Sequence, residues 1–106
     1  MTKAKLTEVL LTCGSWQEAQ NIVDDLFAKK LIACAEFLEV KSKFAWQGEL
    51  NQAKEVKLIM LTTKPKFTSI EKVVRAHHSY DTFVLQALPV DQISKKAQLW
   101  LDEVIE

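Results

Sequence analysis

The sequence predicts an α+β fold in which two helices cover one face of a four-stranded antiparallel sheet and a third helix ends the chain. Apolar, β-branched-rich segments alternate with segments whose apolar residues recur every three or four positions. Two strand-like segments flank the turn at Gln47-Gly48, as in a long hairpin. The 106 residues include only two glycines and two prolines, which indicates short connections. We expect one domain, residues 1–106.

Residues 6–13 form a short apolar run that predicts a strand, and Gly14 ends it. Ser15 and Glu18 then have the spacing of a capping box. The Ser15 hydroxyl should accept from the Glu18 amide, while the Glu18 carboxylate should reach back to the Ser15 amide. A helix is therefore expected to begin here. The apolar stripe of this helix comprises Ala19, Ile22, Val23, Leu26 and Phe27.

Residues 31–46 predict a long strand that is bent or bulged, and its partner should run from about Glu55 to Thr63. Pro65 occupies a first helical position and starts the second helix. A further strand is expected over residues 82–88, stopped by Pro89. The apolar stripes of the second and third helices are Phe67, Ile70, Val73, Val74 and His77, and Ile93, Ala97, Trp100, Leu101 and Val104.

The first six elements, in the order strand, helix, strand, strand, helix, strand, form a split β-α-β repeat, the ferredoxin-like sandwich. Right-handed crossovers place both of its helices on one face of the sheet. In the strand that ends at Thr63, Val56 and Leu58 face one way, while Ile59 and Leu61 face the other. Both faces are therefore apolar, and one copy cannot bury both. We expect the C-terminal helix or another copy of the chain to cover the second face, and hence a homo-oligomer.

The charge balance disfavours several classes of partner. Fourteen Lys and Arg residues match fourteen Asp and Glu residues, so the formal net charge is zero. This argues against nucleic acid or an anionic membrane surface as a partner. No run has the length of a membrane span, and no apolar signal region follows the first five residues. Cys13 and Cys34, the only cysteines, have the setting of reduced thiols, so we expect a cytoplasmic protein.

The candidate metal ligands are Cys13 at the end of the first strand and His77 and His78 at the end of the second helix. These two elements run in the same sense, so the three residues should meet at one edge of the sheet. One thiolate and two imidazoles suit copper or zinc. The alternative is structural: His77 completes an apolar helix face, His78 caps the helix, and Cys13 is a small buried residue. Adjacent histidines on a helix diverge by about 100°, so both reach one ion only if the helix has ended.

Aromatic residues beside the hairpin turn form a second candidate site. Phe44, Trp46 and Trp16 could stack a ligand, although aromatics in this position are more often anchors between subunits. Tyr80 and Asp81 could act as an acid and a base, or as turn residues that lead into the next strand.

Two further titratable residues have structural alternatives. Glu55 either faces a pocket, pairs across the hairpin or is a solvated edge charge. Cys34 has no basic neighbour in its own strand that would activate it, so we expect it in the core.

Four motifs in order resemble the CutA family of divalent cation tolerance proteins. They are Lys30-Leu31-Ile32-Ala33-Cys34-Ala35, then Phe44-Ala45-Trp46-Gln47-Gly48, then Glu55 with the apolar strand ending Thr62-Thr63, then His78-Ser79-Tyr80-Asp81 leading to Ala87-Leu88-Pro89-Val90. The resemblance spans nearly the whole chain. It implies a trimer related in architecture to PII signalling proteins, with long hairpins that join neighbouring subunits and a role in metal tolerance.

The chain also departs from the family pattern. Ala35 and Glu36 stand where the family typically has Val-Asn, and Leu61 stands where a Lys is common. Ser79 and Val84 replace a proline and a carboxylate of the motif that begins at His78 in this chain. A polar pocket between subunits built on that Lys and Glu would be apolar here. The resemblance therefore implies that the scaffold is kept while the family pocket is altered.

The function favoured by these observations is that of a non-enzymatic homotrimer in divalent metal tolerance, binding copper (Cu²⁺) or another divalent cation. The alternative is a PII-like scaffold for a small ligand or a partner protein. An RNA-binding module of the same fold is less favoured, because the strands lack a base-stacking aromatic pair and a basic stripe is missing. A small hydrolase such as an acylphosphatase would need an Arg after the first strand, whereas the only Arg is Arg75.

Overall fold

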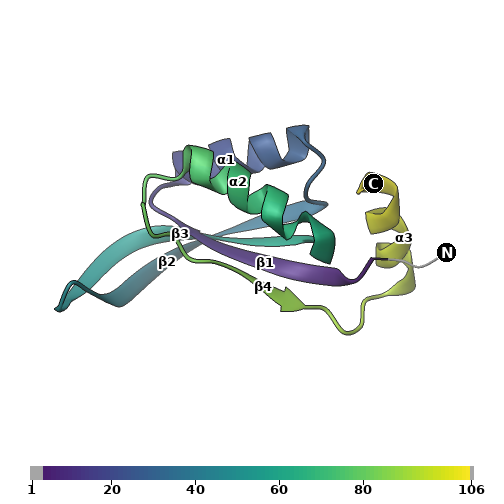
Figure 1. The fold of residues 1–106 in the computed structure, drawn as a ribbon. Helices are drawn as coiled ribbons and strands as arrows, with labels where there is room; N and C mark the ends of the chain where they lie inside the picture. Colours follow the sequence, from purple (N-terminus) through teal and green to yellow (C-terminus); the bar gives the residue numbers. More distant parts are fainter. Residues whose placement is uncertain (1–3, 106) are drawn as a thin grey trace.

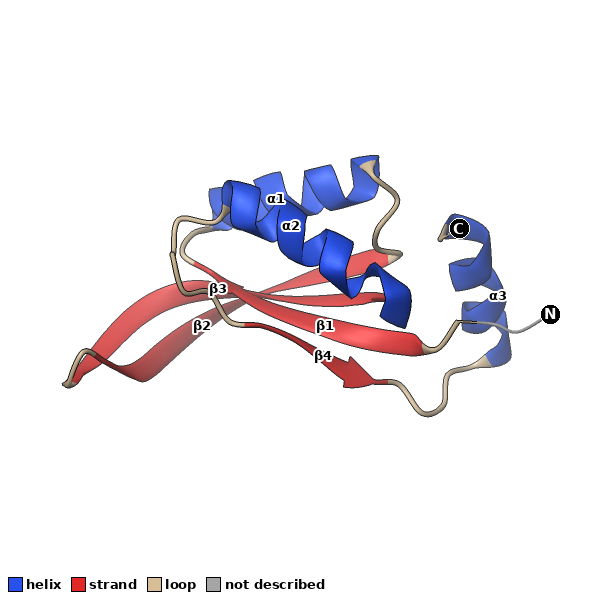
Figure 2. Cartoon of the chain, in the orientation of Figure 1, coloured by secondary structure: helices blue, strands red, loops and turns tan. Residues whose placement is uncertain are grey.

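The structure, a computed structural model, describes residues 4–105 and has the predicted ferredoxin-like architecture. In Figure 1 and Figure 2, helices α1 and α2 cover one face of a sheet whose order is β2-β3-β1-β4. All neighbouring strands are antiparallel. The elements are β1 (Leu6–Cys13), α1 (Trp16–Ala28), β2 (Cys34–Trp46), β3 (Glu49–Thr63), the 3-10 helix η1 (Lys64–Lys66), α2 (Phe67–His77), β4 (Leu85–Pro89) and α3 (Lys95–Val104).

The hairpin β2–β3 is confirmed, and it extends well past the two covering helices (Figure 1). Its strands pair continuously from Cys34 opposite Leu61 to Trp46 opposite Glu49. The two turn residues, Gln47 and Gly48, have φ values of 51° and 78°. Left-handed backbone at both central positions is what a tight two-residue hairpin turn requires. β3 therefore begins at Glu49, six residues earlier than the sequence predicted.

The start of α1 confirms one half of the capping box and corrects the other. The Ser15 hydroxyl accepts from the Glu18 amide at 3.1 Å. The Glu18 carboxylate, however, accepts from the Gly14 amide at 2.7 Å rather than from Ser15. Its other oxygen accepts from the Ser79 amide at 2.6 Å, which draws the carboxylate beyond the helix start toward the end of α2.

The main core lies between the sheet and the two helices. Two members of the predicted helix stripes are not part of it. Phe27 is 45% exposed, and His77 lies at the surface beside Asp25. The buried residues of this core are Val9, Leu11, Cys13, Ala19, Ile22, Val23, Leu26, Leu31, Ile32, Val56, Leu58, Met60, Ile70, Val73 and Val74.

Two further strand boundaries differ from the sequence prediction, and each difference has an identifiable cause. Residues 31–33 link α1 to β2 rather than forming strand, because Lys30 adopts a φ of 55° and the Leu31 amide bonds back to the Leu26 carbonyl. Residues 82–84 form a loop before β4. The facing carbonyl, that of Thr12, is taken by the His78 ring at 2.8 Å, so the ladder between β1 and β4 stops short.

The second face of the sheet is covered only at one end. There α3 packs Leu101 and Ile105 against the start of β1, with Leu61 alongside (Figure 1). Trp100 and Val104, which the sequence placed in the buried stripe of this helix, are 40% and 38% exposed. Over the rest of the face Figure 2 shows no helix in the part of the chain that is described. Apolar side chains stay accessible on it, including Leu38 at 48% and Leu88 at 46%.

Candidate functional site

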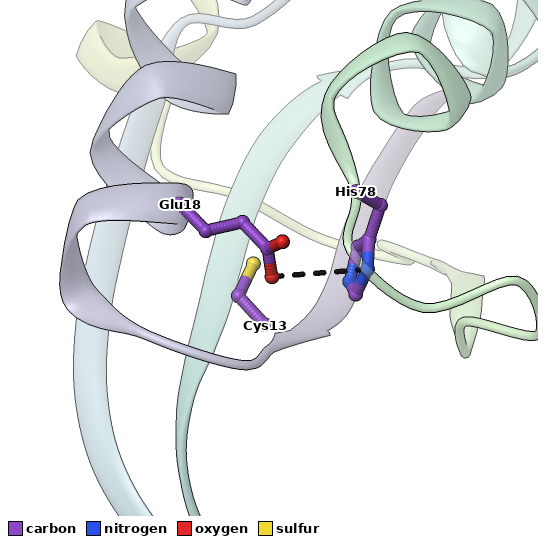
Figure 3. A group of neighbouring side chains, drawn as sticks. All are labelled: Cys13, Glu18 and His78. Carbon is purple, nitrogen blue, oxygen red and sulfur yellow. Dashed lines mark ion pairs between the residues drawn. The ribbon is translucent and has the colours of Figure 1, made fainter.

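Three side chains from different elements converge where β1 ends (Figure 3). Cys13 is the last residue of β1, Glu18 lies in the first turn of α1, and His78 directly follows α2. One ligand atom from each residue, a thiol sulfur, a carboxylate oxygen and a ring nitrogen, lies within 4.8 Å of the other two. The Glu18 carboxylate is 3.7 Å from Nδ1 of His78. We refer to these three residues as the thiol–imidazole cluster.

The His78 ring is held on both of its nitrogens. Nε2 lies 2.8 Å from the Thr12 carbonyl, and Nδ1 accepts from the Tyr80 amide at 3.0 Å. These partners assign the proton of the neutral ring to Nε2. The ring is buried and stacks on Phe83 with centroids 5.1 Å apart. A metal that uses Nδ1 must therefore replace the Tyr80 amide as its partner.

The pKa values of the two acidic groups in the cluster are shifted in opposite directions. Burial raises the pKa of the Cys13 thiol from 9.0 to about 12, and the charges of Glu18 and Glu55 add to this effect. Burial also acts to raise the pKa of Glu18, but hydrogen bonds from Ser79 and Gly14 outweigh it, so that pKa lies below its ordinary value. At neutral pH the cluster thus holds a protonated thiol and a carboxylate beside the His78 ring.

The structure separates His77 from the other two candidate ligands of the sequence analysis. Its Nε2 lies 2.9 Å from the Asp25 carboxylate at the protein surface. Glu18 is the third candidate ligand instead. The sequence analysis had assigned this residue only to helix capping. The signal for this role was present in the sequence, because the first turn of a helix that follows β1 after a two-residue link lies beside the end of that strand.

The donor set fits a borderline divalent cation. Sulfur, imidazole nitrogen and carboxylate oxygen are ligands that Zn²⁺ and Cu²⁺ accept together. Cys13, Glu18 and His78 would hold the ion, and the Cys13 thiol would have to give up its proton to bind it.

A cavity of about 550 Å³ opens beside the cluster, between the hairpin and the segment that follows α2. It includes all five residues that the sequence analysis proposed for a pocket or an interface between subunits: Phe44, Trp46, Glu55, Tyr80 and Asp81. The other lining residues are Thr12, Ser42, Ala45, Thr82 and Val84. We call this space the hairpin cavity.

Glu55 is the buried polar group of the hairpin cavity, with 6% of its surface exposed. The Tyr80 hydroxyl donates to Oε2 of Glu55 at 2.7 Å. Burial and this carboxylate raise the pKa of Tyr80 to about 12, so the phenol stays protonated and remains a donor. Tyr80 thus closes one wall of the cavity by pairing with the sheet.

The remaining candidate residues lie outside the cavity. Trp16 packs on Phe37, with ring centroids 4.9 Å apart, and does not join Phe44. Cys34 is half-buried rather than fully in the core, and burial raises its pKa. Leu61 packs at the α3 end of the sheet.

The fold and the cluster together define a small ferredoxin-like protein with a candidate site for a divalent metal. Residues 7–104 match the family of CutA1 divalent ion tolerance proteins. The chain belongs to this family, and so to the divalent cation tolerance proteins.

Relatives of known description agree with this assignment. The divalent-cation tolerance protein CutA of Archaeoglobus fulgidus is 36% identical over 98 residues, which cover 92% of this chain and 96% of that protein. The CutA protein of Thermotoga maritima is 33% identical over 97 residues, covering 92% and 96%. The solved structure of the A. fulgidus protein, described as periplasmic, superposes with a TM-score of 0.93 at 35% identity, covering 95% of this chain and 99% of that one. In the described part of our chain, no helix combines the length and apolarity needed to cross a membrane.

Proposed function

We propose that the chain is a non-enzymatic homotrimer of the CutA1 family that binds a divalent cation, Cu²⁺ or Zn²⁺, at the thiol–imidazole cluster. The observation that carries this proposal is the convergence of Cys13, Glu18 and His78 within 4.8 Å. The name of the family and of its relatives points to divalent cations without specifying the ion or its ligands.

The surroundings of the cluster favour reversible binding. Glu18 is already ionised and oriented by the Gly14 and Ser79 amides, so it needs no rearrangement to offer an oxygen. Cys13 and His78 each exchange one favourable state for another: the thiol loses its proton, and Nδ1 loses the Tyr80 amide. Both costs lower the affinity and leave the ion able to dissociate.

The test is a titration of the metal-free protein with Zn²⁺ by calorimetry and with Cu²⁺ by its sulfur charge-transfer absorption. Cys13→Ser and His78→Ala should each lower the affinity by about tenfold or more. His77→Ala is the matched control, because it removes a neighbouring imidazole that lies on Asp25 and should leave the affinity unchanged. Thermal unfolding of each variant shows whether the fold is retained. Equal loss in His77→Ala, or no saturable binding in the wild type, would overturn the proposal.

Assembly into trimers is supported by the uncovered face of the sheet. α3 covers one end of this face, while Leu38 and Leu88 stay accessible. An apolar surface of this kind is a typical interface between copies. Sedimentation equilibrium at micromolar concentration should give three times the mass of the chain; a monomer would contradict this part of the proposal.

A cytoplasmic location is supported by two free thiols, Cys13 and Cys34, which form no disulfide with each other. Fractionation of the source cells, with detection of the endogenous protein, tests this location.

The hairpin cavity favours a second candidate function, the binding of a small ligand. Its volume of about 550 Å³ falls within the range of small-molecule sites in proteins.

A further inference from the structure

We propose that Tyr80 sets the metal affinity of the thiol–imidazole cluster, because it holds the ring nitrogen that an ion needs and is itself anchored to Glu55. This inference rests on the proposed metal site and deepens it. Tyr80 is then a positioning residue, which acts on the ion through His78 and does not bind it. Two hydrogen bonds give it this role, one from its backbone and one from its side chain.

The backbone of Tyr80 occupies the nitrogen through which His78 can reach an ion. The Tyr80 amide donates to Nδ1 at 3.0 Å, while Nε2 faces the Thr12 carbonyl at 2.8 Å. Nδ1 is also the nitrogen that lies 3.7 Å from the Glu18 carboxylate. A neutral imidazole has one acceptor nitrogen, so an amide and a metal ion cannot both use it. Metal binding therefore requires the Tyr80 amide to leave.

The residue before Tyr80 is held in place, which confines the change to one peptide unit. The Ser79 amide donates to Oε1 of Glu18 at 2.6 Å. This bond does not use the ring nitrogen of His78, so it can persist when an ion binds. With Ser79 held, the Tyr80 amide leaves the ring by rotation of the peptide unit between Ser79 and Tyr80, which changes φ of Tyr80. The same rotation redirects the Tyr80 side chain.

The side chain of Tyr80 resists this rotation. Its hydroxyl donates to Oε2 of Glu55 at 2.7 Å, and only 6% of the surface of Glu55 is exposed. The Tyr80 ring also lies close to Gly14, because a Cβ placed on that glycine would be 3.3 Å from the ring. A hydrogen bond to a carboxylate is stronger than one between neutral groups, and its loss leaves a buried charge without that donor. An ion that enters the cluster must therefore break the bond between Tyr80 and Glu55.

The bond between Tyr80 and Glu55 connects the cluster with the hairpin. Glu55 lies on β3 opposite Val40, on the same sheet face as Leu38, which stands two residues before Val40 on β2. This is the face that the proposed trimer uses between copies. The bond lies within one chain, so it persists when a neighbouring copy covers the hairpin cavity. Metal binding should therefore alter the base of the hairpin in each subunit.

Tyr80 is the only tyrosine of the chain, so its side chain can be observed by itself. The experiment uses the assembled, full-length protein, freed of metal with a chelator and carrying tyrosine labelled with ¹³C at Cζ, the ring carbon that bears the hydroxyl. We expect Zn²⁺ to move the Cζ signal in the NMR spectrum, and the change to saturate at the same ratio of metal to chain as the calorimetric titration. Zn²⁺ binding with an unmoved Cζ signal would overturn the inference and leave the metal site standing.

Removal of the hydroxyl should strengthen metal binding. Tyr80→Phe keeps the ring and the backbone amide but cannot bond to Glu55, so an ion no longer has that bond to break. We expect Zn²⁺ to bind Tyr80→Phe about tenfold more tightly than the wild type. A residue that only supports the fold would have the opposite effect, because its loss would loosen the site. Equal or weaker binding by Tyr80→Phe would overturn the inference, even where the wild-type Cζ signal moves.

Two control variants complete the test. Thr68→Val removes an exposed hydroxyl at the start of α2, the opposite end of the helix from His78, and should leave the affinity for Zn²⁺ unchanged. His78→Ala should show no movement of the Cζ signal at Zn²⁺ concentrations that saturate the wild type. A gain of affinity in Thr68→Val equal to that in Tyr80→Phe, or a moving signal in His78→Ala, would overturn the inference. If the wild type itself shows no saturable binding of Zn²⁺, the proposed function fails and this inference fails with it.

Discussion

The carboxylate of Glu18 accepts the backbone amide of Ser79 at 2.6 Å and so joins the start of α1 to the end of α2. Its other oxygen accepts the Gly14 amide, so a single side chain ties three segments together. Glu18→Gln removes the charge from both bonds and should lower the free energy of unfolding by about 1–2 kcal/mol at pH 7. Urea unfolding measures this change. Glu71→Gln, which breaks only an exposed ion pair with Arg75, should have an effect close to zero.

The same carboxylate should make stability depend on pH. The pKa of Glu18 is lowered in the folded protein, so its contribution is fully present above the unfolded value of about 4.5 and is lost as the pH falls through the folded value. The difference in stability between wild type and Glu18→Gln should therefore shrink on acidification below about pH 4.5. Urea unfolding across pH 3–7 tests this, and a difference that grows toward low pH would contradict it.

Gly14 is required for close approach rather than for backbone conformation. A Cβ added there would lie 3.3 Å from both the Ser79 hydroxyl and the Tyr80 ring, so that segment would have to shift by a few tenths of an ångström. Gly14→Ala should cost about 1 kcal/mol of stability. Urea unfolding measures this change. An unchanged free energy of unfolding would show that the segment tolerates the shift.

Gly48 is required for the opposite reason. Its φ is +78°, and a Cβ there would meet nothing within 4 Å. Gly48→Ala should lower stability by about 1 kcal/mol through backbone strain alone. Urea unfolding measures this change, and the affinity for metal should stay at its wild-type value. A loss of metal affinity in Gly48→Ala would contradict a purely local effect.

The uncovered sheet face gives a test of assembly. Leu38, 48% exposed, lies on β2 opposite Lys57, on the face away from α1 and α2. Leu38→Glu should shift the protein toward monomers in sedimentation velocity, because it places a charge in an apolar interface. Phe27→Glu is the matched control, since Phe27 is 45% exposed on α1. Equal dissociation by both variants would point to general destabilisation rather than to this face.

The sequence predicted the fold well where local chemistry decides the outcome. The hairpin turn was predictable because Gly48 readily adopts left-handed backbone, and the start of α1 because Ser15 can cap it. Boundaries set by distant contacts were less predictable. β4 begins late because the His78 ring takes the Thr12 carbonyl, a bond between residues 66 positions apart.

In the candidate site, too, some contacts were predictable from the sequence and others were not. Cys13 and His78 could be brought together from topology alone, because their elements end at the same edge of the sheet. The position of Glu18 beside the end of β1 was also readable from the sequence, but the direction of its carboxylate was not, since the Ser79 amide at the end of α2 sets it. The surface position of His77 follows from its pairing with Asp25, which lies on another helix.

His78 belongs to the thiol–imidazole cluster, and Tyr80 and Asp81, which follow it closely in the chain, line the hairpin cavity. An ion that takes Nδ1 of His78 frees the Tyr80 amide, and the Tyr80 phenol is what Glu55 holds. Occupancy of either site should therefore change the affinity of the other through this short stretch of backbone. Thermodynamic reciprocity requires that the factor by which the metal changes the affinity for a ligand in the hairpin cavity is also the factor by which that ligand changes the affinity for the metal.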